Sequence, residues 1–63
     1  MAYDNLVFAV AASYVRRLGP KAVEDLEEQA ELAAALGDAE SAAIWREIAV
    51  MADDMLRPRR LAS

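Results

Sequence analysis

Apolar residues recur at helical spacing in three segments of the chain, and glycine-containing turns separate the segments. Because successive helix positions are about 100° apart, such a pattern places one apolar stripe on each helix. The pattern predicts helices over residues 5–18, 20–36 and 39–56, and no competing run has turn residues spaced for strand pairing. The predicted fold class is all-α, arranged as a three-helix bundle or an orthogonal three-helix array.

The first predicted helix is apolar around more than half of its circumference. Asp4 is expected to be its N-cap, with Tyr3 and Phe8 spaced as a hydrophobic staple. Two neighbouring helices with stripes made partly of alanine cannot cover so wide an apolar arc. We therefore expect a homodimer across a two-fold axis, with a different protein as the alternative occupant of the same surface. The expected contacts lie on one of two flanks: Leu6, Val10 and Tyr14, or Phe8 and Val15.

Glycine marks both expected turns. Gly19 can adopt the positive φ that ends a helix, and Pro20 suits the first position of the next helix. A junction this short implies either a steep crossing of the two helices or fraying of the last turn. At the second turn, Gly37 is expected to end one helix and Asp38 to accept a backbone N–H at the start of the next.

The second and third helices supply most of the predicted core. The second helix has a thin face that ends in Leu36 and is rich in alanine, which favours close approach to a bulkier helix. Leu32 lies off this face and is expected to be exposed or to meet a second surface. Trp45 is the only tryptophan, and it is assigned to the core rather than to a methionine-lined groove for a partner helix. The predicted core comprises Val23, Leu26, Ile44, Trp45, Ile48, Met51 and Met55.

Composition allows one domain in 63 residues, predicted over residues 1–57, with a flexible basic tail over residues 58–63. Hydrophobic residues make up 57% of the chain but aromatic residues only 6%, so alanine carries much of the apolar content. The chain lacks cysteine, so it can form no disulfide, and a reducing cytoplasm is the expected compartment. The apolar run over residues 6–12 is not expected to be a signal peptide, because no lysine or arginine precedes it, and it is too short to span a membrane.

Catalysis is not expected, because the chain has no histidine and no cysteine for a nucleophile–base pair. No metal and no cofactor are expected either. Four glutamates share one face of the second helix, but that face lies opposite the apolar stripe, which favours a solvated surface over a metal site. This acidic face comprises Glu24, Glu27, Glu28 and Glu31.

The basic tail contains Arg59 and Arg60, and Arg57 directly precedes it. These three arginines are expected to be solvated, with phosphate or an acidic helix as alternative contacts. A net charge of −4 disfavours nucleic-acid binding. A helix-turn-helix reading is disfavoured for the same reason, since Asp38 and Glu40 would face phosphates at the start of the recognition helix.

Two resemblances accompany this pattern. Gly37-Asp38, Ala42, Trp45 and Ala49 resemble the second helix of a tetratricopeptide hairpin, although the preceding helix departs from that pattern and no second repeat is present. The wider pattern is similar to short bacterial helical proteins of unknown function, which implies a bacterial, cytoplasmic, single-domain protein and no particular activity. It consists of Arg17-x-Gly19-x-x-Ala22, Ala30, Gly37-Asp38 and Trp45-x-x-Ile48.

The sequence thus predicts a small, non-catalytic protein–protein interaction or structural module that self-associates. One alternative is a nucleic-acid-associated regulator that uses the arginine tail. The other is an accessory or inhibitory subunit whose acidic helix docks on a basic surface of an unidentified protein.

Overall fold

The computed structural model describes residues 2–58, with side chains from Asn5 onward. Its helices are α1 (Ala2–Leu18), α2 (Lys21–Ala35) and α3 (Ala39–Leu56), and the described residues contain no strand. The all-α prediction is confirmed. The third helix has the predicted bounds, and the second differs by one residue at each end. The tail residues Arg59 and Arg60 lie outside the described part of the chain.

The start of α1 differs from the prediction. The helix begins at Ala2, so Asp4 lies inside its first turn and is not the N-cap. Neither Ala2 nor Tyr3 is a helix-breaking residue, so the helix can extend to Ala2. A carboxylate such as that of Asp4 suits the positive end of the helix dipole anywhere in the first turn. Phe8 is exposed, and the side chain of Tyr3 is outside the described set, so no staple is established.

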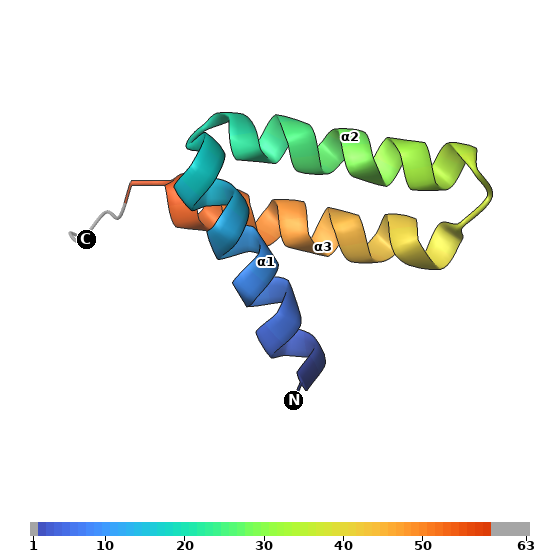
Figure 1. Cartoon of the computed structure of the whole chain (residues 1–63), viewed down its shortest axis with the longest axis horizontal. Coiled ribbons are helices and arrows are strands. Elements are labelled where there is room, and N and C mark those ends of the chain that lie inside the picture. Colours follow the sequence, from blue (N-terminus) through green and yellow to red (C-terminus); the bar gives the residue numbers. More distant parts are fainter. Residues whose placement is uncertain (1, 59–63) are drawn as a thin grey trace.

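Figure 1 shows that α2 and α3 run antiparallel and side by side, whereas α1 crosses them at a steep angle near the end of α3. The N-terminal half of α1 projects away from the hairpin. Of the two possibilities for the Gly19-Pro20 junction, the steep crossing is the one observed. Gly19 has φ +59°, its N–H donates to the carbonyl of Val15 at 2.8 Å, and its own carbonyl accepts from the N–H of Ala22 at 2.9 Å.

The turn between α2 and α3 joins a helix stop directly to a helix start. Gly37 has φ +83°, and its N–H donates to the carbonyl of Ala34 at 3.0 Å. The N–H of Asp38 donates to the carbonyl of Ala33 at 2.9 Å, which completes a Schellman motif. The Asp38 carboxylate then accepts the N–H of Ser41 at 3.1 Å and caps α3. Both predicted roles in this turn are confirmed.

Alanine fills most of the buried positions. Among residues 5–58, ten hydrophobic residues are buried and seven of them are alanines, and Leu26 is the largest fully buried side chain in that range. Small side chains let helix backbones approach closely, so α2 and α3 can pack with a short distance between their axes. The ten are Val7, Ala11, Ala22, Leu26, Ala30, Ala33, Ala42, Ile48, Ala49 and Ala52.

The larger predicted core residues lie around this alanine centre. Leu26 and Ile48 are buried, whereas Trp45 is only partly buried and packs on the edge of the core. Trp45 meets the ring of Tyr14 edge-to-face, with centroids 6.3 Å apart, and the Arg17 guanidinium carbon lies 5.2 Å from the Tyr14 centroid. The indole therefore lies at the rim of the core, beside α1. Val23, Ile44, Met51 and Met55 are likewise partly buried against the core.

Leu36 corrects a second expectation. The apolar pattern places it on the face of the second helix that packs against a neighbouring helix, but its side chain is 84% exposed. The helix ends at Ala35, and Leu36 occupies the cap position at the tip of the hairpin. Because α1 crosses the opposite end of the hairpin, no third helix covers this tip (Figure 1). Leu32, one turn earlier, is 54% exposed.

Candidate interaction surfaces

The projecting half of α1 carries the first candidate surface. Val7 is buried against the core, and its sequence neighbours Leu6 and Phe8 are 57% and 55% exposed. Since consecutive helix positions are about 100° apart, Leu6 and Phe8 point to either side of Val7. Of the five residues predicted at an interface, these two are exposed. The other three, Val10, Tyr14 and Val15, are partly buried and pack against the core.

A hollow of about 400 Å³ lies in the angle between α1 and α3. Val50 borders it and is 65% exposed, although it is a branched apolar residue. Val50 does not stand out in the sequence, because it lies on the charged side of α3, away from the apolar stripe. A single valine among charged residues was the available signal. The hollow is lined by Val7, Arg46, Glu47, Val50, Met51 and Asp54.

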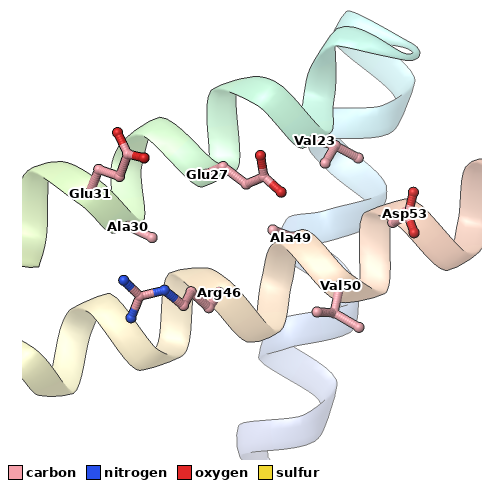
Figure 2. A pocket seen from close by; sticks show the side chains of 8 residues that line it. All are labelled: Val23, Glu27, Ala30, Glu31, Arg46, Ala49, Val50 and Asp53. Atoms are coloured by element: carbon pink, nitrogen blue, oxygen red, sulfur yellow. The ribbon is translucent and has the colours of Figure 1, made fainter.

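A second groove, of about 470 Å³, lies between α2 and α3. Figure 2 shows its side chains in front of the two helices, with α1 passing behind them. The groove is therefore on the face of the hairpin that α1 leaves uncovered. Its apolar lining is Val23, Ala30, Ala49 and Val50, and its charged lining is Glu27, Glu31, Arg46 and Asp53.

The charges around this groove are mostly unpaired. Between residues 5 and 58 the only ion pair joins Arg57 Nη2 to Asp53 Oδ2 at 2.8 Å, and both side chains are exposed. Glu27, Glu31 and Arg46 have no ion-pair partner within that part of the chain. With respect to the side chains of residues 5–58, the groove thus presents two carboxylates on α2 and one guanidinium on α3 that are not in ion pairs.

The Asp38 carboxyl, at the start of α3, has a shifted pKa. The pKa of Asp38 is lowered, first by the hydrogen bond from the backbone N–H of Ser41 and second by a hydrogen bond with the Ser41 side chain. This is the signature of a helix cap. No buried polar or charged side chain is present among the residues whose side chains are described.

The acidic face is exposed along its whole length: Glu24, Glu27, Glu28 and Glu31 all lie in solvent. Within the described residues, no three carboxylate, histidine or cysteine side chains are grouped so that they could hold a metal ion. No helix in that part of the chain has both the length and the apolar character needed to cross a membrane.

Comparisons of the chain with protein-family models, with curated proteins and with solved structures found no match. The resemblances to short bacterial helical proteins and to a tetratricopeptide hairpin therefore stay predictions.

Proposed function

We propose that the chain is a small, non-catalytic interaction module that self-associates as a homodimer. The observation that supports this proposal is the exposure of Leu6 and Phe8 on the projecting half of α1, together with Val50 on α3. Covering half-exposed side chains of this size contributes about 1 kcal/mol each. A second molecule on this surface removes them from water.

A two-fold interface requires that one surface supply both the projecting and the receiving parts. Leu6 and Phe8 project from α1, and the hollow bordered by Val50 and Met51 lies beside the same helix. The hollow also carries both signs of charge, because Arg46 lines it together with Glu47 and Asp54. Arg46 of one protomer can therefore pair with a carboxylate of the other, which lessens the repulsion between two chains of net charge −4.

A second candidate function is that of an accessory subunit whose acidic helix docks on a basic protein. The exposure of all four glutamates on the acidic face favours it. The arginine-tail regulator is less favoured, because Arg57 is paired with Asp53 and the chain has a net charge of −4.

Sedimentation of the full chain at micromolar concentration tests the homodimer. We expect a dimer, and we expect Leu6→Lys/Phe8→Lys to convert it to a folded monomer with unchanged helical content. The matched control is Leu32→Lys/Leu36→Lys, which places the same charges at two exposed leucines near the tip of the hairpin, Leu32 in α2 and Leu36 at its C-cap, and should stay dimeric. The charges are placed at Leu6 and Phe8 and not at Val10, because Val10 packs against the core and a charge there would destabilise the monomer itself.

A monomeric wild-type chain at high micromolar concentration would overturn the proposal. Equal loss of the dimer in the α2 control would show that added charge, and not the α1 surface, governs association.

A further inference from the structure

We propose that the groove between α2 and α3 binds an amphipathic helix with basic flanks, supplied by a different protein. The inference goes beyond self-association and does not rest on it, since the groove lies on the hairpin face opposite α1 (Figure 2). Arg46 and Val50 line both this groove and the α1–α3 hollow. The two proposals must therefore be tested at other positions.

The shape of the groove suits a rod. Glu27 and Glu31 are one turn apart on α2, and Arg46, Val50 and Asp53 follow at the same spacing on α3, so both walls run along helix axes. The 15 residues of α2 extend over about 22 Å, a length matched by a partner helix of the same size. Ala30 and Ala49 form a floor of small side chains, which allows a third helix to approach closely.

The chemistry of the lining excludes the usual small-molecule site. Such a site encloses its ligand and orients it with a few converging polar groups. This groove is open along the hairpin, and no buried polar side chain points into it within the described residues. What remains is an apolar strip between charged walls, the arrangement that binds the apolar face of an amphipathic helix.

The charges select the partner. The two unpaired carboxylates, Glu27 and Glu31, lie on the α2 wall, and Asp53 adds a third carboxylate already paired with Arg57. A second copy would bring the same acidic walls face to face. It would fit the groove poorly, because like charges opposed across an interface are destabilising. Lysine or arginine one turn apart on an incoming helix would meet Glu27 and Glu31, and an acid on its other flank would meet Arg46.

The test uses a fluorescein-labelled synthetic helix of about 15 residues, with a leucine–alanine stripe, two lysines one turn apart on one flank and one glutamate on the other. Fluorescence anisotropy with the full chain should show saturable binding, and backbone amide shifts should change at Val23, Ala30 and Ala49. Glu27→Gln/Glu31→Gln should weaken binding about fivefold at low salt, as expected for two exposed ion pairs.

The matched control is Glu24→Gln/Glu28→Gln, which removes the same charge at the same spacing on the same helix but outside the groove lining. We expect this control to weaken binding less than twofold. A peptide with its two lysines replaced by glutamate should not bind.

Three results would each overturn the proposal. They are equal weakening by both double variants, amide shifts confined to α1, and equally tight binding of the acidic peptide. If Glu27→Gln/Glu31→Gln instead altered the dimer in sedimentation, the groove would be an interface between copies of this chain. The Leu6→Lys/Phe8→Lys variant should bind the basic peptide normally, so failure of one proposal leaves the other distinguishable.

Discussion

The α2–α3 hairpin and the projecting half of α1 solve the problem of burial in opposite ways. In the hairpin, alanines such as Ala30 and Ala49 are buried because two helices lie against each other along their length. In α1, Leu6 and Phe8 are more hydrophobic than alanine, yet more than half of each is exposed. Burial in this molecule therefore depends on whether a neighbouring helix is within reach, and less on how apolar the side chain is.

The same contrast distinguishes the two turns. The hairpin turn fixes the relation of α2 to α3 through the Schellman bonds at Gly37 and the cap at Asp38. At the other turn, Pro20 precedes α2 without any side-chain cap. The hairpin turn thus has a side-chain cap in addition to its backbone hydrogen bonds, whereas the turn at Gly19 has backbone hydrogen bonds alone. The placement of α1 therefore depends more on packing by residues such as Val7 and Ala11.

The largest expected effect comes from Leu26, which is fully buried where the three helices meet. Leu26→Ala should destabilise the fold by about 2–5 kcal/mol, through lost burial and the cavity left behind. Leu32→Ala is the control, because it makes the same change on the same helix at a half-exposed position. Urea unfolding followed by circular dichroism measures both. Similar losses of stability for the two variants would contradict the conclusion that burial depends on a neighbouring helix within reach.

A smaller effect is expected at Gly37, whose φ of +83° is unfavourable for residues with a Cβ. A Cβ there would meet no atom within 4 Å, so the cost of Gly37→Ala is conformational. We expect a loss of about 1 kcal/mol, because the left-handed strain is partly offset by reduced entropy of the unfolded chain. Gly37→Asn should lose less, since asparagine tolerates this conformation. A rise in Tm for Gly37→Ala would rule out the proposed strain.

Gly19→Ala sharpens the comparison between the turns. Gly19 also has a positive φ and open space around it, so the local cost should be similar. Amide hydrogen exchange should increase mainly in α1. The turn at Gly19 joins α1 to the hairpin, whereas α2 and α3 are joined separately by the turn at Gly37 and Asp38. Increased exchange throughout α2 and α3 would show that the hairpin depends on α1 for its order.

The smallest effect concerns the exposed cap Asp38. Its pKa is lowered from 3.8 in the folded state, so its ionised form contributes stability above that pH and loses it as pH falls through the folded pKa. Asp38→Asn retains a good capping side chain but does not titrate. The Tm advantage of the wild type over this variant should be present near neutral pH and decline below about pH 3.8. A constant difference across this range would exclude a contribution from the charge.

Much of the fold could be predicted because its signals are local. Gly37 and Asp38 mark the end of one helix and the start of the next within two residues. The spacing of apolar residues along each helix identifies the buried faces, which contain Leu26 in α2 and Ile48 in α3. The start of α1 could not be placed, because Asp4 is as acceptable inside a first turn as at a cap. Helix periodicity also predicts which face of a helix is apolar, but it does not predict the angle at which two helices cross. The extent to which α1 would project was therefore beyond the sequence.

The candidate surfaces were less predictable for a related reason. Leu6 and Phe8 were recognised from the wide apolar arc of the first helix, but Val10, Tyr14 and Val15 belong to the same arc and pack inward. Only the crossing of α1 over α3 separates the two groups. The groove combines Glu27 with Arg46, residues far apart in sequence, and no spacing rule within one helix relates them.

The predominance of alanine in the core has a consequence for how this protein can change over generations. At the seven buried alanines almost every replacement adds atoms, because only glycine is smaller. Variation at these positions therefore tends to push helices apart, a cost of about 1–3 kcal/mol per site, and seldom opens cavities. Lasting change is easier at the rim, where Trp45, Met51 and Met55 can exchange volume with one another. Lineages of this chain should keep their small residues and vary the large ones.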